Sequence, residues 1–204
     1  AEKFQVTREE QDKFALKSQE KALKAQKENK FKEEIINFKI KSQKNVHDFD
    51  KDEHPREGIN LETLSRLKPV FKKDGTVTAG NSSGINDGAA AVILMSSEEA
   101  EKRNLKKLVS IKSWASCGVD PALMGTGPIP SSKKALELAG WSIKDVDLFE
   151  INEAFAAQSI AVLKTLSIPD EKVNVNGGAI ALGHPIGASG TRILVTLIHE
   201  MIKR

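Results

Sequence analysis

The pattern of hydrophobic and polar positions changes about a third of the way along the chain. Up to about Thr76, Lys, Glu and Gln are frequent, and apolar residues are scattered among them. Within this part, Thr7 and Glu10 have the spacing of a capping box, in which each side chain accepts a hydrogen bond from a free backbone N–H at a helix start. The residues that follow, to about Asn29, are only modestly apolar on one side, so we expect a helix on the surface.

Only short elements are predicted between this helix and Thr76. Ile35, Phe38 and Ile40 fit one short strand in an otherwise irregular stretch. A short helix is expected from Asn60 to Leu67, and Pro69 ends it because proline cannot continue a helix.

After Thr76 the chain is rich in Gly, Ala and Val, and strand-like segments alternate with helix-like ones. The run from Gly88 to Met95 is apolar and predicts a buried segment. Strands are predicted at Val109 to Ala115, Val146 to Ile151 and Val173 to Val175. Helices are predicted from Ser97 to Arg103, from Ser131 or Ser132 to Gly140, from Glu153 to Leu166 and onward from about Ser189. Such alternation is typical of an α/β fold, with helices layered on a mixed sheet.

Composition excludes several classes of protein. The chain has 204 residues and a net charge of +3, which is too small to predict DNA binding. Eight Phe, two Trp and no Tyr disfavour modules that stack aromatic rings on nucleic-acid bases. No apolar run reaches the ~18–20 residues that cross a membrane, and no secretory signal is visible. The one cysteine, Cys117, allows no internal disulfide, and no metal-ligand spacing is present.

The first segment with candidate chemistry runs from Glu150 to Gln158. Asn152 lies where a predicted strand passes into a predicted helix, which is where α/β proteins place ligands. Its amide can hold a water molecule or a substrate carbonyl. The alternative is that Asn152 simply caps the helix, which is a frequent use of asparagine.

The second segment runs from Asn174 to Gly190 and contains five glycines in a short span. His184 lies between Gly183 and Pro185, just before a predicted helix start, whose free N–H groups disfavour an imidazolium. A neutral imidazole suits a general base or an oxyanion donor. The alternatives are a buried structural histidine and a phosphate-binding loop. Neither phosphate-loop pattern, GxxxxGK[ST] or GxGxxG, is present.

Several stretches together resemble the thiolases, most closely those that act on acetoacetyl-CoA. They are the segments from Thr78 to Ala91, Gly118 to Pro128, Asn152 to Phe155 and Asn176 to Pro185. The resemblance covers the whole chain and implies part of the thiolase fold. Residues 1–84 would belong to its loop domain, and residues 85–204 to its C-terminal domain, truncated before the last strands.

The resemblance also implies roles for particular residues. His184 matches the histidine that activates a thiol nucleophile, and Asn152 matches the asparagine that holds a catalytic water in an oxyanion hole. Residues matching coenzyme A contacts are Ser83, Ala154 and Phe155 near the pantetheine, Phe71 near the adenine, Arg56 near the phosphates and Met124 at the acyl pocket. Without the resemblance, Phe71 and Met124 are equally explained as core residues, and Arg56 as a solvated charge.

The implied reaction joins two acetyl-CoA into acetoacetyl-CoA and CoA, or reverses it, without a metal or a cofactor. The family is homo-oligomeric, as a dimer or tetramer, and occurs in the cytoplasm or the mitochondrial matrix. Its two catalytic cysteines lie outside this chain, and Cys117 matches neither. We therefore expect the chain to be a fragment that is inactive alone. Alternatives are a non-catalytic acyl-CoA-binding module with this fold, and an enzyme that condenses carrier-protein-linked chains.

Overall fold

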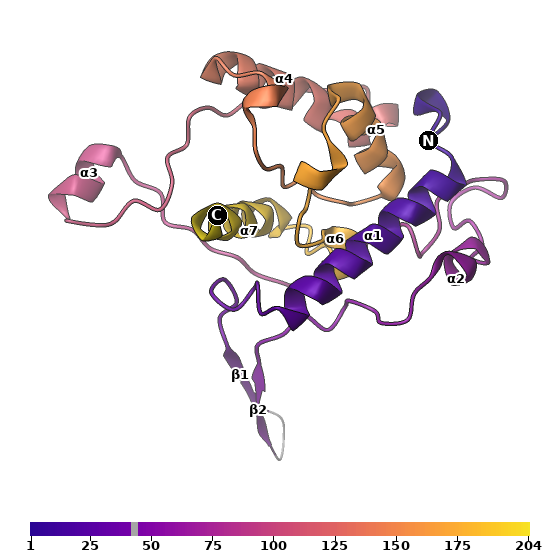
Figure 1. The fold of residues 1–204 in the computed structure, drawn as a ribbon, viewed down its shortest axis with the longest axis horizontal. Helices are drawn as coiled ribbons and strands as arrows, with labels where there is room; N and C mark the ends of the chain where they lie inside the picture. The colour runs from indigo at the N-terminus through magenta and orange to yellow at the C-terminus, as the bar shows by residue number, and fades with distance from the viewer. Residues whose placement is uncertain (42–44) are drawn as a thin grey trace.

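The computed structural model describes residues 1–41 and 45–204 and is mainly helical (Figure 1). Its helices are α1 (Arg8–Lys27), α2 (Leu61–Ser65), α3 (Ser97–Lys102), α4 (Pro128–Ala139), α5 (Ala156–Leu166), α6 (Ala179–Leu182) and α7 (Ser189–Lys203). Its strands are β1 (Phe38–Lys41) and β2 (Val46–Phe49). Short 3₁₀ turns lie at Glu2–Phe4, Pro121–Thr126, Ile143–Asp145 and Asp170–Lys172. Over the described part of the chain, no helix is both long and apolar enough to cross a membrane.

Helix α1 starts as predicted and has an exposed charged face, but its other face is more deeply buried than its modest apolar content suggests. The capping box is present: the backbone N–H of Thr7 donates to Glu10 Oε2 at 2.7 Å, and that of Glu10 donates to Thr7 Oγ1 at 3.2 Å. One face of α1 packs against α2, α5 and α6 (Figure 1). That face buries only small and polar residues, namely Gln11, Asp12, Ala15, Ser18, Gln19, Ala22 and Ala25. Short side chains allow this close packing without a continuous apolar stripe.

The close packing of α1 is visible at Gly177. This residue has a φ of +80°, and a Cβ there would lie 2.7 Å from Ala22 of α1. Any larger residue would push α1 away from the loop that leads into α6.

The hydrophobic core has two clusters that meet at Phe14 of α1. The first contains Val6, Ala15, Ala156, Ile160, Ala161 and Ile180. The second contains Val162, Leu163, Leu166, Ile168 and Val173. Helix α5 contributes to both clusters, so it is the element around which α1 and α6 are fixed.

Little of the predicted sheet is formed within the described residues. Phe149 and Val173 form a single parallel bridge, whereas Val109 to Ala115 has no strand partner there. A strand needs a neighbouring strand to pair with its backbone groups, whereas the described neighbour of this segment is α4, whose Ala135 carbonyl accepts from the Ser113 hydroxyl at 2.6 Å. Strands β1 and β2 form an exposed antiparallel hairpin, with Phe38 opposite Phe49. Phe38 and Ile40 lie in β1 as predicted, and Ile35 lies outside it.

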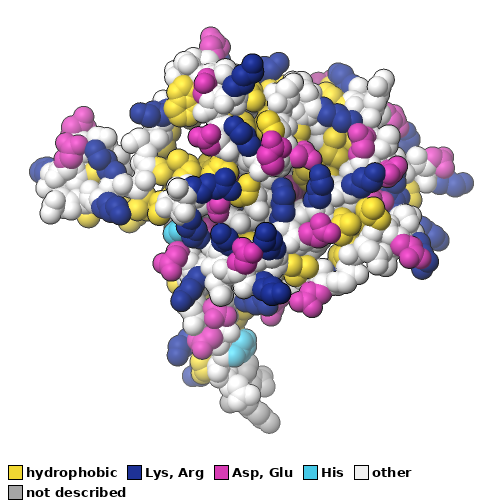
Figure 2. Space-filling view, in the orientation of Figure 1, with side chains coloured by type: hydrophobic (Ala, Val, Ile, Leu, Met, Phe, Trp, Pro, Cys, Tyr) yellow, Lys and Arg dark blue, Asp and Glu magenta, His cyan; other side chains and the backbone are white. Residues whose placement is uncertain are grey.

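The apolar run from Gly88 to Met95 is exposed, which contradicts the prediction of a buried segment. Ile93 is 87% exposed and Leu94 is 68% exposed. Helix α3 follows on a long loop away from the body of the molecule, and apolar side chains show on the surface between them (Figures 1 and 2). The first residues of the run lie beside Pro185 and Val92 is half-buried, but the large side chains of Ile93, Leu94 and Met95 are exposed.

Several helix boundaries differ from the prediction by a few residues. Helix α3 is capped by Ser96 rather than Ser97. Helix α4 starts at Pro128 rather than beside Ser131 or Ser132, and ends as predicted at Gly140, whose φ is 70°. Helix α5 starts at Ala156 instead of Glu153, because Glu153 is held by side-chain contacts described below.

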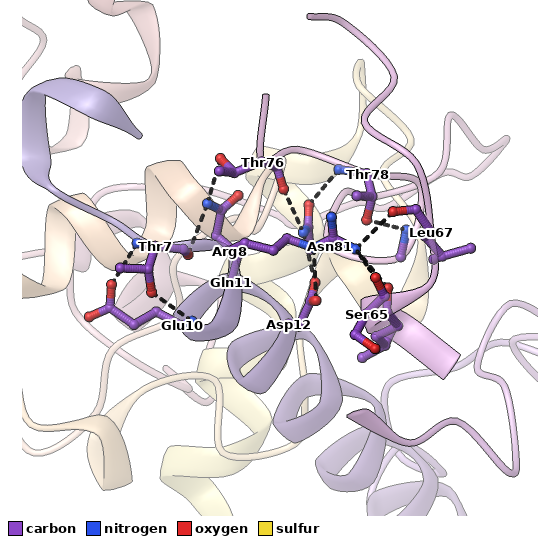
Figure 3. Close-up of polar contacts among 12 residues, drawn as sticks. Thr7, Arg8, Glu10, Gln11, Asp12, Ser65, Leu67, Thr76, Thr78 and Asn81 are labelled. Carbon is purple, nitrogen blue, oxygen red and sulfur yellow. Dashed lines mark hydrogen bonds and ion pairs between the residues drawn. The ribbon is translucent and has the colours of Figure 1, made fainter. Parts of the chain in front are cut away.

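Polar side chains of α1 anchor the turn at residues 76–81 (Figure 3). Gln11 Nε2 donates to Thr76 Oγ1 at 2.9 Å, and Asn81 Nδ2 donates to Asp12 Oδ1 at 2.9 Å. The backbone N–H of Thr78 in turn donates to Asn81 Oδ1 at 2.8 Å. The backbone carbonyl of Asn81 accepts from the N–H of Ala156 at the start of α5. The turn is thereby fixed against the start of α5.

Candidate active site

His184 follows a sharp turn of the backbone at Gly183, directly after α6. Gly183 has a φ of +95°, and a Cβ there would lie 2.6 Å from the Asn86 side chain. That side chain accepts a hydrogen bond from the backbone N–H of His184, with Asn86 Oδ1 at 3.2 Å. Residues 85 and 184 form a parallel bridge, so two distant segments hold the histidine.

The hydrogen bonds of the His184 ring define its tautomer. His184 Nδ1 lies 2.6 Å from Ser189 Oγ, and the Ser189 hydroxyl donates to the carbonyl of Pro185 at 3.0 Å. Since that hydroxyl proton is already used, the serine oxygen accepts, and Nδ1 carries the ring proton. His184 Nε2 therefore presents a lone pair.

Asn152 lies against that lone pair. Its Nδ2 is 3.3 Å from His184 Nε2, so the amide donates to the ring and the Oδ1 points elsewhere. Asn152 Oδ1 is buried and has no hydrogen-bond partner among the described residues. Asn152 is not a helix cap, because Phe155 occupies the N-cap position of α5. A buried acceptor without a partner is a site for a water molecule or a ligand donor.

Electrostatics favour a neutral imidazole. Burial lowers the pKa of His184, and the positive charge of Arg192 on α7 lowers this pKa further. The direction is the predicted one, and its causes are burial and Arg192. At neutral pH Nε2 therefore carries no proton and can take one up in place of the hydrogen bond from Asn152, as a general base must.

The most buried ionisable residue of the site, Glu153, was missed in the sequence. It is 2% exposed, and its carboxylate accepts from the Ser18 hydroxyl at 2.6 Å, Asn174 Nδ2 at 2.8 Å and the backbone N–H of Ile180 at 3.2 Å. Burial raises the pKa of Glu153, and these hydrogen bonds oppose the rise. The available signal was a charged residue directly before the small apolar run that builds α5.

Four of the residues predicted to contact coenzyme A lie together. The hydroxyl and the backbone N–H of Ser83 both donate to the carbonyl of Ala154, each at 3.1 Å. The rings of Phe71 and Phe155 meet edge to face, with centroids 5.8 Å apart. Phe71 is 74% exposed, which contradicts its alternative assignment to the core.

The other two predicted contact residues lie apart from this group. Met124 is 74% exposed, so it too is not a core residue. It belongs to the turn Pro121–Thr126, which packs on α5. The Arg56 side chain is exposed, while its backbone N–H donates to Gln19 Oε1 on α1 at 3.0 Å.

An open groove is lined by the residues that directly follow His184 in the chain. It has a volume of about 450 Å³ and is lined by residues 86–90, residues 185–188 and Thr191. The two sides of the groove come close together at Gly88 and Pro185, where a Cβ on Gly88 would lie 2.9 Å from the proline ring. Cys117, half-buried, is not among the lining residues.

Comparison with known proteins identifies the family. Residues 1–98 match the family model described as thiolase, N-terminal domain, and residues 105–204 match thiolase, C-terminal domain. Acetyl-CoA acetyltransferase of Rhizobium meliloti is 58% identical over 204 residues, which cover 100% of this chain and 52% of that protein. The cytosolic acetyl-CoA acetyltransferase of Rattus norvegicus is 57% identical, with 98% of this chain and 51% of that protein covered.

Solved structures agree with this result. The acetyl-CoA acetyltransferase of Bacillus anthracis has a TM-score of 0.97 and 52% identity, with 100% of this chain and 52% of that one covered. Human mitochondrial 3-ketoacyl-CoA thiolase has a TM-score of 0.93 and 45% identity, with 100% and 51% covered. The predicted fold class is confirmed for the part that is present. The chain spans about half the length of the relatives it matches, and it belongs to the thiolase family.

Proposed function

We propose that the polypeptide carrying these residues is a thiolase-type acyltransferase. It joins two acetyl-CoA into acetoacetyl-CoA and CoA, or cleaves acetoacetyl-CoA in the reverse direction. The observation that carries the proposal is the pairing of His184 Nε2 with Asn152 Nδ2 at 3.3 Å, which leaves a buried, unpartnered Asn152 Oδ1. Relatives named acetyl-CoA acetyltransferase, which are 57–58% identical over nearly the whole of this chain, support the assignment.

His184 would remove the proton from a thiol nucleophile. The thiolate attacks the acetyl carbonyl of one acetyl-CoA and forms an enzyme thioester, while the thiolate of CoA leaves. A second acetyl-CoA then loses an α-proton to a base, and its enolate attacks the thioester and releases the enzyme thiol. Asn152, through a water molecule on its free Oδ1, together with the His184 ring would stabilise the negative oxygen of this enolate.

The nucleophilic thiol would come from outside residues 1–204. Cys117 has no hydrogen bond or ring contact with His184 and does not line the groove beside it. The groove beside Pro185, the next residue after His184, would leave room for a second segment near the histidine. We therefore propose that the chain by itself does not turn over, and that Cys117 is not the nucleophile.

Coenzyme A would bind along the contacts of Ser83. Ser83, Ala154 and Phe155 would line the pantetheine, and Phe71 the adenine, since its ring is exposed and already packed on Phe155. The exposed Arg56 would bind phosphate, and Met124 would limit the acyl pocket. A human mitochondrial 3-ketoacyl-CoA thiolase has been solved with CoA, which supports this ligand. We propose no metal and no further cofactor, a homo-oligomeric protein, and a cytoplasmic or mitochondrial matrix location.

Thiolysis of acetoacetyl-CoA tests the proposal, with the mass of the sample measured in parallel. The 204-residue chain of 22.3 kDa should show no turnover, whereas the longest natural polypeptide that contains it should be active. His184→Ala should abolish that activity and leave CoA binding in place. Turnover by the 22.3 kDa chain that Cys117→Ala removes would contradict the assignment of the nucleophile. CoA binding without turnover in every form would favour the alternative, a non-catalytic acyl-CoA-binding module.

A further inference from the structure

Asn152 lies between two residues that are both fixed by Asn174. The backbone N–H of Ile151 donates to Asn174 Oδ1 at 2.8 Å, and Asn174 Nδ2 donates to the carbonyl of Ile151 at 2.8 Å. The same Nδ2 donates to Glu153 Oε1 at 2.8 Å. Asn174 has a φ of 42°, so its backbone holds an uncommon conformation to reach both neighbours.

Glu153 connects Asn152 to the segment that ends at His184. Its Oε2 accepts from the backbone N–H of Ile180 in α6, and α6 ends one residue before Gly183. A Cβ at Gly178 would collide with the Glu153 carboxylate, so the start of α6 also lies directly against it. Asn152 and His184 therefore share a common support on either side of the 3.3 Å contact between them.

Helix α1 is the third part of this support. The Ser18 hydroxyl donates to Glu153 Oε2 at 2.6 Å, and its oxygen accepts from the backbone N–H of Gly178 at 3.1 Å. One serine thus joins α1 to both Glu153 and the start of α6. Three donors face the two carboxylate oxygens, and none of these contacts needs a proton on the carboxylate.

We propose that Glu153 is a positioning residue that holds Asn152 against His184 through its contacts with Ser18, Asn174 and Ile180. The proposal rests on the proposed function, because the geometry that it fixes is that of the catalytic pair. A displacement of about 1 Å in such a pair reduces a rate by about 10²-fold, although binding elsewhere is unchanged. Glu153 is therefore expected to affect the chemical step rather than the binding of coenzyme A.

Glu153→Gln tests the proposal, because glutamine has nearly the same shape as glutamate but replaces one accepting oxygen with an NH₂ group. This NH₂ group cannot accept, so at least one of the present hydrogen bonds to the carboxylate is lost. In the longest natural polypeptide that contains the chain, we expect kcat for thiolysis to fall about 10²-fold, with KM changed less than about threefold. Glu200→Gln is the matched control. Glu200 is 6% exposed and also accepts from an asparagine, with Asn176 Nδ2 at 2.8 Å, but it lies on α7 without contact to Asn152 or His184.

Ser18→Ala is a milder variant in case Glu153→Gln does not fold. It removes one of the three donors and should lower kcat less than Glu153→Gln does, again without a change in KM. Equal kcat values for wild type and both site variants would overturn the proposal. So would a loss of kcat in Glu200→Gln as large as that in Glu153→Gln.

Nitrogen-15 NMR of the His184 ring gives a readout that does not depend on turnover. Wild type should show the Nδ1–H tautomer, with an Nε2 shift that reflects a hydrogen bond from Asn152. Glu153→Gln should move the Nε2 signal toward that of a free nitrogen, whereas Glu200→Gln should not. If wild type lacks thiolase activity but this difference is seen, the proposed function fails and the positioning role stands. An unchanged Nε2 signal in Glu153→Gln would overturn the positioning role.

Discussion

Two regions of the molecule differ in how far their hydrophobic residues are buried. Around α1, α5 and α6, small apolar residues are buried, and the buried Glu153 carboxylate accepts three hydrogen bonds. Between residues 85 and 115, by contrast, large apolar side chains such as Ile93 and Trp114 are exposed, at 87% and 80%. The segments of the first region pack against one another. The large apolar side chains of the second stay exposed, although this region contacts the rest of the described chain at residues 85–88 and at Ser113.

The two regions show that an apolar sequence pattern does not by itself determine burial. An apolar run predicts burial only when the covering surface is also present. His184 and Asn152 lie next to α6 and α5 in the packed region, which explains why they meet although the predicted sheet is scarcely formed. Figure 2 shows basic and acidic side chains intermixed on the face that carries α1, so charge does not distinguish the two regions.

The largest expected effect is on catalysis. His184→Ala removes the proposed general base, and general-base catalysis raises a reaction rate by about 10²–10⁴-fold. We expect kcat for thiolysis by the longest natural polypeptide to fall by about that factor, measured under saturating substrate. Ile93→Ala, in the exposed region, is the control and should leave kcat unchanged, because Ile93 takes no part in the 3.3 Å contact between Asn152 and His184. A rate that survives the loss of His184 would contradict the assignment of the base.

Stability should show the next largest contrast. Leu163 is 6% exposed within the second core cluster, so Leu163→Ala should cost about 2–5 kcal/mol of the free energy of unfolding. Ile93→Ala should change the same quantity by less than about 0.5 kcal/mol in the 204-residue chain. Urea unfolding of both variants checks this. Similar costs for the two substitutions would show that the exposed run is packed in solution.

The sequence was informative where the interactions are local. The capping box of Thr7 and Glu10 and the end of α4 at Gly140 depend on a few neighbouring residues, and both are confirmed. The sequence was misleading where the outcome depends on a distant partner, as for the run from Gly88 to Met95 and the strand at Val109 to Ala115. The first is exposed and the second has no strand partner among the described residues.

The candidate site divides in the same way. His184 could be predicted from its glycine-rich context and Asn152 from its place between a predicted strand and a predicted helix, and the resemblance to thiolases added the role of each. Glu153 was not predicted, because its three donors come from residues 18, 174 and 180, and their convergence on one carboxylate is a tertiary property.

Stability should also depend on pH through Glu150. Burial raises the pKa of Glu150 to about 8, although the Arg192 charge at 4.0 Å opposes this. The unfolded chain has an ordinary carboxyl, so between about pH 5 and 8 the folded state binds more protons. Stability should therefore fall as pH rises through that range, by up to about 1.4 kcal/mol per pH unit from this group. Urea midpoints at pH 6 and 8 measure the slope, and Glu150→Gln should reduce it. An unchanged slope would mean that Arg192 keeps the folded carboxyl ionised.

The smallest expected effect compares the same interaction in the two regions. Thr7 caps α1, which packs against three other helices, and Ser96 caps the six-residue α3, which has no packed neighbour among the described elements. Each side chain accepts from a backbone N–H three residues on, at 3.2 Å and 3.1 Å. Replacing a capping Ser or Thr by Ala costs about 1 kcal/mol where the helix is part of the cooperative fold.

Thr7→Ala should therefore lower the free energy of unfolding of the 204-residue chain by about that amount. Ser96→Ala should leave it unchanged, because α3 can fray without disturbing the core. Amide exchange would show the complementary result, with faster exchange confined to α3 in Ser96→Ala. An equal loss of global stability in the two variants would mean that α3 unfolds together with α1, and that residues 85–115 are part of the same cooperative unit.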